Sequence, residues 1–444
     1  MRMFNLGIAV GLFLGLNLAL TPSLGATGGG LALVATIAWL WTTEALHVSV
    51  TAVLVPLLAA VSGVLPFDGA LKQFADPVIF LFLGGFALAA GLQRQGLDRW
   101  MAAQVIRRAG NRLDHAARWL FGLTAFLSMW ISNTATAAMM LPLALGLLAS
   151  LPIERYRSSY MYVLLGVAFS ANIGGIGTLV GSPPNAIAAA QVGLGFAGWL
   201  AWGLPMVLVL MPLMDIALRF ALKPELSAEV ELPPPQAAWT RPQKQMLALF
   251  GATVLLWVFG APLNVWLEMG RGYDAAVAVF ALVMLHALRL TEWKAVERST
   301  DWGVLLLFGG GLTLSKALAE SGAAAWLAGQ LGGPLETLPA FVCLALMILF
   351  ALLITEVTSN TASAALLIPL FIGLAPQIDS TTLAVLVAVG TSCAFLLPVA
   401  TPPNAIVFGS GHVPQRVMIR AGLWVSLLVF PVLVAVAAGV LTLV

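Results

Sequence analysis

Charged side chains are scarce in this chain. Lysine, arginine, aspartate and glutamate together make up 9% of its 444 residues, whereas a soluble globular protein carries about 25%. Hydrophobic residues make up 60%, and apolar runs such as 6–20 and 421–444 approach or exceed the ~20 residues that span a bilayer. The composition therefore excludes a soluble domain and predicts an all-α polytopic membrane protein.

Cysteine and histidine are also rare, and their placement argues against several kinds of site. Cys343 and Cys393 lie in apolar segments without paired spacing, so we expect core residues rather than a disulfide or metal site. The four histidines are scattered near the ends of apolar stretches. An integral-membrane enzyme would need a nucleophile–base pair or a metal cluster, and the polar segments supply neither. We therefore expect no enzyme, and the scattered net charge of +2 gives no sign of a nucleic-acid partner.

The apolar stretches predict eleven transmembrane helices and two interrupted segments. The expected helices cover residues 4–21, 28–43, 48–65, 77–93, 160–191, 197–220, 246–263, 273–290, 303–319, 383–411 and 421–443. The interrupted segments, 119–150 and 339–372, are too long for soluble linkers, and each carries a Ser-Asn-Thr triplet near its centre. The N-terminal stretch shares features with a secretory signal, but we interpret it as a retained first helix because many spans follow it.

The distribution of basic residues predicts the orientation. If the N-terminus is cytoplasmic and both interrupted segments enter and leave on one side, every lysine and arginine faces the cytoplasm except Lys72, Arg271 and Lys316. A full span at either segment would place part of this set on the wrong side. We therefore expect two re-entrant hairpins, 119–150 entering from the cytoplasm and 339–372 from the outside, in a multi-pass protein of the cell (inner) membrane. The six arginines within 93–119 predict an amphipathic helix on the cytoplasmic surface.

The sequence contains an internal repeat. "SNTATAAMMLP" (132–142) and "SNTASAALLIP" (359–369) are identical at seven of eleven positions, and "GSPPNAI" (181–187) is echoed by "ATPPNAI" (400–406). Because each copy would contain an odd number of crossings, the second copy is inverted in the membrane. We expect an N-terminal helix (1–26), a first repeat (27–220), a cytoplasmic linker (221–245) and a second repeat (246–444).

Paired prolines interrupt two of the expected spans. Pro183-Pro184 and Pro402-Pro403 cannot continue a helix, and the carbonyls they free are tolerated in a membrane only when protein, water or ions satisfy them. Inverted repeats with broken helices are typical of secondary transporters, whose binding site lies near the bilayer midplane. An ion channel is the alternative, but two occluding hairpins favour alternating access.

The polar residues of the four motifs restrict the ligand. Serine, asparagine and threonine oxygens suit alkali cations, and they can equally hydrogen-bond a carboxylate. No lysine, arginine or histidine lies in or beside the motif segments. A bound anion must therefore be neutralised by cations bound with it and by the N-terminal ends of half-helices. Two matching triplets favour a small molecule with two acidic groups.

These paired motifs closely resemble those of the divalent anion–sodium symporters, including bacterial sodium-coupled C4-dicarboxylate transporters, over nearly the whole chain. The resemblance implies a homodimer in membrane lipid, with a scaffold and an elevator-type transport domain in each protomer. It also implies import of small dicarboxylates of the succinate, fumarate and malate class, coupled to Na⁺. Sodium-independent dicarboxylate exchange, and transport of sulfate or tricarboxylates, remain as alternatives within the family.

The resemblance also implies particular site residues. It places a first sodium site at Ser128, Ser132, Asn133 and Gly181, and a second at Thr355, Ser359, Asn360 and Ala400. It places the substrate carboxylates among Asn133, Thr134, Ser182, Pro183, Asn360, Thr361, Thr401 and Pro402.

Two acidic residues in apolar stretches, Glu44 and Glu356, are functional candidates by position alone. Glu356 corresponds to Met129 in the repeat, so we expect a buried, hydrogen-bonded group rather than a direct ligand of a symmetric site. Asp215 is expected to pair with Arg219, four residues further along its helix.

Overall fold

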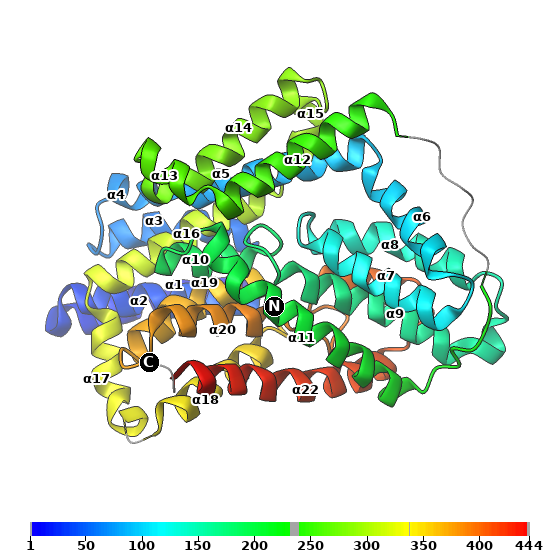
Figure 1. Ribbon diagram of the computed structural model, residues 1–444. Coiled ribbons are helices and arrows are strands. Elements are labelled where there is room, and N and C mark those ends of the chain that lie inside the picture. The colour runs from blue at the N-terminus through cyan, green and yellow to red at the C-terminus, as the bar shows by residue number, and fades with distance from the viewer. Residues whose placement is uncertain (1, 231–238, 337, 442–444) are drawn as a thin grey trace.

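The computed structural model describes residues 2–230, 239–336 and 338–441. Within these ranges the protein is built from helices and contains no strand (Figure 1). The first half contains α1 (Arg2–Leu24), α2 (Ala26–Thr43), α3 (Val48–Val61), α4 (Phe67–Leu71), α5 (Pro77–Arg94), α6 (Leu97–Ala109), α7 (Leu113–Ser128), α8 (Asn133–Leu148), α9 (Ile153–Gly175), α10 (Pro183–Val192) and α11 (Phe196–Leu222). The second half contains α12 (Arg241–Phe259), α13 (Ala261–Leu267), α14 (Tyr273–Ala287), α15 (Trp293–Ser299), α16 (Trp302–Glu320), α17 (Ala323–Glu336), α18 (Ala340–Ile354), α19 (Asn360–Leu374), α20 (Ser380–Ser392), α21 (Pro402–Gly409) and α22 (Gln415–Leu441).

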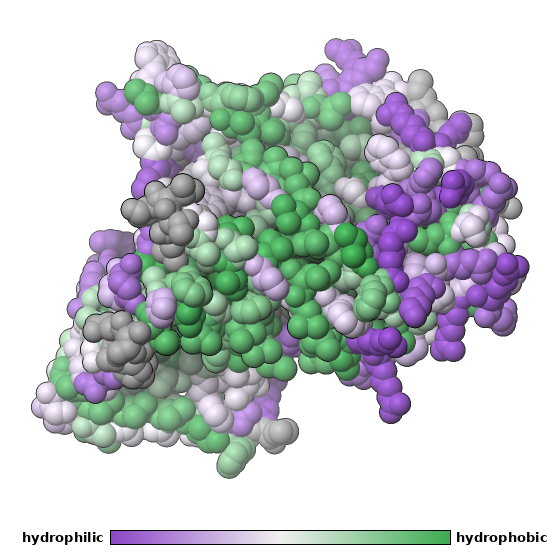
Figure 2. Space-filling view, turned by 60° about the horizontal axis from the view of Figure 1, so that its bottom comes forward, coloured by the Kyte–Doolittle hydropathy of each residue, from purple (hydrophilic) through white to green (hydrophobic). Residues whose placement is uncertain are grey.

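The helices agree with a multi-pass membrane protein, and each expected span overlaps a helix or a broken pair, although residues 442 and 443 of the last span lie outside the described residues. Among the described residues, five helical segments are long and apolar enough to cross a membrane alone, and α12 with α13 adds a sixth if that pair, bent by 78°, is one span. Other apolar helices, such as α3 and α20, have fewer than 18 residues. The count of eleven spans therefore stays a prediction. Figure 2 shows a broad apolar surface across one face, with hydrophilic residues gathered toward the right-hand end.

Each Ser-Asn-Thr triplet lies at the tip of a helical hairpin. The hairpins are α7–α8 and α18–α19, and in each the second helix begins at the asparagine of the triplet, Asn133 or Asn360. The preceding serine is the N-cap, a position where a short polar side chain is favoured, and Ser132 Oγ accepts a hydrogen bond from Ala135 N at 3.3 Å. The triplet thus lies where the second helix of each hairpin begins.

The expected amphipathic helix at 93–119 is divided between two helices, so a single helix over this range is wrong. α6 ends at Gly110, whose φ of 80° lies in the left-handed region that glycine adopts readily. The remaining residues, from Leu113 onward, form the first turns of the hairpin helix α7.

The paired prolines lie where two apolar spans are interrupted. Pro183 and Pro402 are the first residues of α10 and α21, a position at which the missing N–H costs nothing. Residues 176–182 separate α9 from α10, and residues 393–401 separate α20 from α21. Each broken span thus consists of two half-helices joined by an irregular loop.

The two halves of the chain pack crosswise. α10 of the first half contacts α19 and α20 of the second (Figure 1). α21 of the second half contacts α8 and α9 of the first. Four further helices, here called the outer helices, also pair between the halves: α5 packs on α14, and α3 packs on α16. The result is that both hairpin tips and both irregular loops meet in the interior.

Close helix contact depends on glycine at a few positions. A Cβ added to Gly174 would lie 2.3 Å from the carbonyl oxygen of Ala125, so α9 touches the backbone of α7 there. A Cβ on Gly310 would likewise lie 2.6 Å from the carbonyl oxygen of Ala52, where α16 crosses α3. Larger residues at these positions would separate the helices that carry the tips and loops.

The expected linker, 221–245, is partly ordered against the first half. α11 continues to residue 222, and beyond it Ala228 O accepts a hydrogen bond from Leu113 N at 3.0 Å, while Val230 N donates to Asn111 O at 2.7 Å. Residues 231–238 of this linker lie outside the described residues. The described part is therefore attached to the start of the first hairpin.

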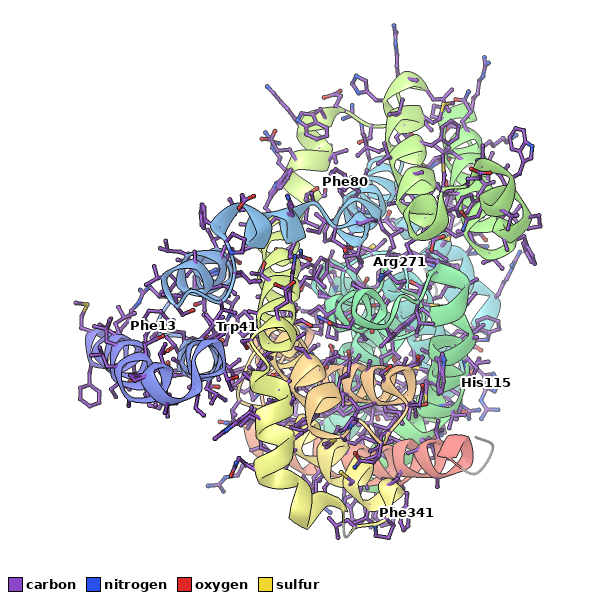
Figure 3. All side chains as sticks on the ribbon, turned by 90° about the vertical axis from the view of Figure 1, so that its left-hand side faces the viewer. Phe13, Trp41, Phe80, His115, Arg271 and Phe341 are labelled. Atoms are coloured by element: carbon purple, nitrogen blue, oxygen red, sulfur yellow. The ribbon has the colours of Figure 1, made fainter. Side chains whose placement is uncertain are left out.

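Helices α1 and α2 project from one side of the molecule, where Phe13 and Trp41 mark their positions in Figure 3. α1 packs mainly on α2, and apolar side chains such as Leu18 are largely exposed. This surface is available to lipid or to a second protomer, and the expected homodimer stays a prediction.

Candidate functional site

A central cavity of about 600 Å³ lies between the hairpin tips, the irregular loops and helices of the outer layer. All eight positions that the resemblance assigned to the substrate line it: Asn133, Thr134, Ser182, Pro183, Asn360, Thr361, Thr401 and Pro402. Asn133 and Asn360 are also assigned to sodium, and four further sodium positions line the cavity, namely Ser132, Gly181, Ser359 and Ala400. Ser128 and Thr355 are fully buried behind the tips. The fold thus brings together residues that are more than 200 positions apart in the chain.

The two tips repeat one hydrogen-bonding arrangement. Ser128 Oγ lies 2.6 Å from Asn133 Oδ1 and 2.7 Å from the carbonyl oxygen of Ala171. Thr355 Oγ1 lies 2.7 Å from Asn360 Oδ1 and 2.7 Å from the carbonyl oxygen of Thr391. A hydroxyl has one proton, so it can donate to only one of its two neighbours in each cluster. Lone pairs on the remaining oxygens are left available, as a cation such as Na⁺ requires.

An asparagine holds each irregular loop together. Asn185 Nδ2 donates to the carbonyl oxygens of Gly175 at 2.8 Å and Thr178 at 2.7 Å. In the second half, Asn404 Nδ2 donates to Ala394 O at 3.2 Å and to Leu397 O at 3.1 Å. These amides satisfy carbonyls that the break in the helix would otherwise leave buried and unpaired. The sequence motifs contained both residues, although the sequence analysis gave them no role.

Asn172 joins the two halves at the site, and the sequence analysis missed it. Its Nδ2 lies 3.1 Å from Thr401 Oγ1 and 3.3 Å from Asn404 Oδ1. Its own Oδ1 is buried and has no hydrogen-bond partner among the described residues, and the same holds for Asn185 Oδ1. Buried polar atoms normally have partners, so these oxygens point to water or an ion at the site. The available signal was a lone asparagine within an apolar stretch.

Two glycines bring backbone oxygens next to the first tip. A Cβ on Gly175 would lie 2.4 Å from Asn133 Oδ1, so the end of α9 touches that side chain. A Cβ on Gly181 would lie 2.5 Å from the carbonyl oxygen of Gly175 and 3.1 Å from that of Met129. The surroundings of Gly181 are therefore rich in carbonyl oxygen, the hard donor that alkali cations prefer.

The opposite wall of the cavity carries negative charge. Glu44, His47 and Asp301 line it from the outer helices, and all three are exposed. His47 Nδ1 accepts a hydrogen bond from Ser49 N at 3.3 Å. No histidine is near the motifs in sequence, but the fold brings this one to the cavity. Among the described lining residues there is no lysine or arginine, so no basic side chain neutralises an anion there.

Glu356 and Asp215 have the surroundings expected for them. Glu356 is buried and accepts hydrogen bonds from the backbone of the loop after α20. Asp215 pairs with Arg219, whose Nε lies 3.0 Å from Asp215 Oδ1. Arg219 also reaches Asp114 and Tyr162, and these residues join α7, α9 and α11 away from the cavity.

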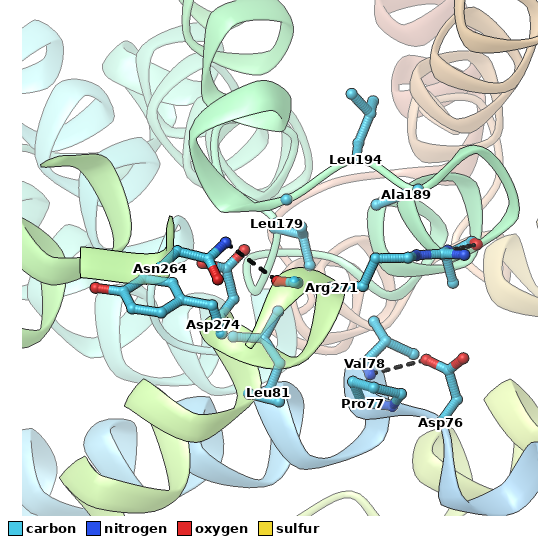
Figure 4. A pocket seen from close by; sticks show the side chains of 16 residues that line it. Asp76, Pro77, Val78, Leu81, Leu179, Ala189, Leu194, Asn264, Arg271 and Asp274 are labelled. Atoms are coloured by element: carbon cyan, nitrogen blue, oxygen red, sulfur yellow. Dashed lines mark hydrogen bonds between the residues drawn. The ribbon is translucent and has the colours of Figure 1, made fainter. Parts of the chain in front are cut away.

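A second cavity of about 380 Å³ lies between the end of α10 and the segment leading into α14 (Figure 4). Its charged residues already have partners. Asp76 accepts from Val78 N at 2.9 Å, Asp274 accepts from Phe196 N at 2.6 Å, and Arg271 donates to Ala190 O at 2.9 Å. None of the expected site residues lines this cavity, so the central cavity is the candidate site.

Comparisons with known proteins give consistent results. A family model described as "Citrate transporter" matches residues 37–390. An "Uncharacterized transporter" of Haemophilus influenzae is 46% identical over 407 residues, covering 90% of this chain and 88% of the relative. The "Sodium-dependent dicarboxylate transporter SdcS" of Staphylococcus saprophyticus is 32% identical over 480 residues, covering 98% and 92%.

Solved structures share the fold at lower identity. The YdaH transporter of Alcanivorax borkumensis has a TM-score of 0.60 at 15% identity, covering 83% of this chain and 86% of its own. MtrF of Neisseria gonorrhoeae has a TM-score of 0.56 at 14% identity, covering 82% of each chain. At such identities the likeness concerns the helical transporter fold alone.

Proposed function

This chain belongs to the citrate-transporter family and, with its relatives, to the divalent anion–sodium symporters. On that premise we propose that it imports small dicarboxylates together with Na⁺. The substrate class is that of succinate, fumarate and malate. A relative at 32% identity is named as a sodium-dependent dicarboxylate transporter, which supports both parts of the proposal.

The observation that carries the proposal is the doubled tip in one cavity. Asn133 and Asn360 lie on opposite hairpins, each is hydrogen-bonded to a buried hydroxyl, and both line the same space. A dicarboxylate has two charged ends joined by a short carbon chain. One tip for each end, with a cation site beside each tip, fits such a molecule better than a monovalent anion.

Electrostatics explain why cations must accompany the substrate. Removing an ionised carboxylate from water costs several kcal/mol unless an opposite charge or good hydrogen bonds compensate. The described wall offers the carboxylates of Glu44 and Asp301 and no lysine or arginine. Two sodium ions at the tips, together with the N-terminal ends of α8, α10, α19 and α21, would supply the compensation.

The cavity also suggests the state of the transport cycle. With a cytoplasmic N-terminus, α1 and α2 cross the membrane twice, and residues 44–47 return to the cytoplasmic side. Glu44, His47 and Asp301 then form a cytoplasmic mouth, so the protein faces inward. In an elevator-type movement, α10, the tips and the loops would move relative to the outer helices within each protomer of a homodimer. The hydrogen bond from Arg271 to Ala190 O would then break.

Succinate binding to the purified protein across a sodium titration tests the proposed function. Choline should hold the ionic strength constant. We expect succinate affinity to rise steeply with sodium, because each cation removes a charge penalty that the anion would otherwise incur. Succinate affinity that does not change with sodium would reject symport and favour dicarboxylate exchange, while binding of citrate or sulfate alone would reassign the substrate.

The hairpins can be tested by labelling of single cysteines in membranes. In a background with Cys343 and Cys393 replaced by alanine, Arg112→Cys and Ser150→Cys should react with an impermeant maleimide only from the cytoplasmic side. Pro339→Cys and Gln377→Cys should react only from the outside. All four positions are exposed. Labelling of either pair from opposite sides would show that the hairpin crosses the membrane.

A further inference from the structure

A buried carboxylate that the doubled site does not explain lies directly behind the second tip. Glu356 follows Thr355 in the turn between α18 and α19, and its side chain is 6% exposed. Its Oε1 accepts hydrogen bonds from Phe395 N at 2.8 Å and Leu396 N at 3.1 Å. Its Oε2 lies 3.1 Å from Leu396 N and 3.2 Å from Leu397 N.

Three successive backbone N–H groups that converge on one point form a concavity that favours an anion. Here the anion is part of the protein. The carboxylate replaces hydrogen bonds that residues 395–397 lose when α20 ends at Ser392. Hydrogen bonds to a charged group are stronger than those between neutral groups, so this contact holds the loop firmly.

The same loop is held on its other face by Asn404, and the two contacts meet at Leu397. Leu397 N donates to Glu356, while Leu397 O accepts from Asn404 Nδ2 at 3.1 Å and from Ala400 N at 3.2 Å. Ala400 and Thr401 follow directly and line the central cavity. Glu356 is therefore connected through a single residue, Leu397, to the backbone of the proposed second cation site.

The first half makes the corresponding contact with the chemical roles exchanged. The tip residue there is Met129, and its carbonyl oxygen accepts a hydrogen bond from Thr178 Oγ1 of the loop. The N–H groups of Ile176 and Gly177 instead complete local turns, to Ile173 O at 3.1 Å and Gly174 O at 2.9 Å. One half thus joins tip to loop with a neutral hydroxyl, and the other with a carboxylate.

From this juxtaposition we infer that Glu356 is a positioning residue of the second sodium site. It holds the loop 395–397 in place with a carboxylate, whereas the first site uses a neutral hydroxyl. The inference rests on the proposed sodium coupling. Glu356 is not among the residues that line the central cavity and acts through the loop, so its loss should disturb the cation that Ala400 and the Asn360 tip share. The dicarboxylate should be affected only through that cation.

The test is the sodium titration of succinate binding applied to Glu356→Gln and Glu356→Asp. Glutamine keeps the volume but removes the charge and points an N–H₂ group at the backbone donors. The sodium concentration for half-maximal binding should rise by about ten-fold or more, since a hydrogen bond to a charged group is worth about that factor or more. Succinate affinity at saturating sodium should stay within about two-fold, and aspartate should recover part of the loss.

Two further variants serve as controls. Glu320→Gln removes an exposed carboxylate that is paired only loosely with Lys316, at 3.8 Å, and should titrate as the unaltered protein does. Thr178→Val removes the equivalent contact in the first half and should raise the sodium requirement less, because one neutral hydrogen bond is lost. Hydrogen exchange of the amides of 395–397 should accelerate in Glu356→Gln and stay unchanged in Thr178→Val.

The outcomes separate the two proposals. If the unaltered protein binds succinate without sodium, the symporter and the role of Glu356 both fail. If the unaltered protein depends on sodium but Glu356→Gln keeps its sodium requirement, only the role of Glu356 is overturned. The role of Glu356 would also be overturned if Glu356→Gln lost succinate affinity at saturating sodium by the same factor as its sodium requirement rose. Such a result would show a general structural role. Size-exclusion profiles confirm that each variant is folded.

Discussion

Replacing Asn133 with alanine should raise the sodium concentration needed for half-maximal succinate binding by about ten- to a hundred-fold, because the tip loses an oxygen ligand worth about 1.5–3 kcal/mol to a charged partner. Asn360→Ala should have a similar effect, since both side chains accept from a buried hydroxyl at almost the same distance, 2.6 and 2.7 Å. The measurement is the sodium titration of succinate binding in each variant and in the double variant.

Linkage adds a second requirement to this result. If sodium strengthens succinate binding by some factor, succinate must strengthen sodium binding by the same factor, and each single variant should reduce both factors equally. The adjacent threonines provide the contrast. Thr134→Ala and Thr361→Ala should lower succinate affinity at saturating sodium and leave the sodium requirement nearly unchanged. The assignment of the tips is wrong if the asparagine and threonine variants show the same pattern.

Gly174→Ala should cause a large loss of stability in the folded protein. The new methyl group would lie 2.3 Å from Ala125 O and 2.4 Å from Ala125 Cα, and neither backbone atom can move without shifting α7. Overpacking of this kind costs about 1–3 kcal/mol and sometimes more. Because Gly175, the next residue, touches the first tip, sodium-coupled binding should weaken along with stability.

Gly122→Ala is the matched control, in the helix that Gly174 contacts. It is an exposed position inside α7, and nothing lies within 4 Å of the added methyl group. Alanine is favoured over glycine in a helix by up to about 1 kcal/mol, so this variant should melt at the same or a higher temperature. Thermal unfolding in detergent compares the two. A Gly174→Ala protein that melts with the unaltered one would show that α7 and α9 are not in such close contact.

Local features of the site could be predicted from the sequence. The Ser-Asn-Thr triplet predicts an interruption of an apolar segment, and Pro183 predicts a break in an apolar span, because proline geometry acts within a few residues. The structure places helix starts at both asparagines and at both prolines accordingly. The family assignment follows from the same short motifs.

Contacts between distant segments could not be predicted in this way. Asn172 meets Thr401, and His47 reaches the cavity, only because the two halves pack crosswise. Nothing in the residues beside Asn172 or His47 encodes that packing. The expected helix at 93–119 was too long for a different, local reason: Gly110 follows the last residue of α6 with a φ of 80°, which ends the helix.

Glu356 shows a limit of comparing repeats position by position. Its counterpart is Met129, which carries no charge, and the lack of a matching residue argued against direct function. The matching interaction is present all the same, between Met129 O and Thr178 Oγ1. Two copies of a repeat can keep a contact while exchanging which partner supplies the side chain.

The reach of Asn172 into the second half has a consequence for biosynthesis. The first irregular loop is held by Asn185 through bonds within residues 175–185, so it can close as soon as that segment has left the ribosome. The second loop has its own Asn404, but the amide of Asn172 completes it from a helix made more than 200 residues earlier. We therefore expect the second loop to reach its final shape only after Asn172 of the earlier half is in place.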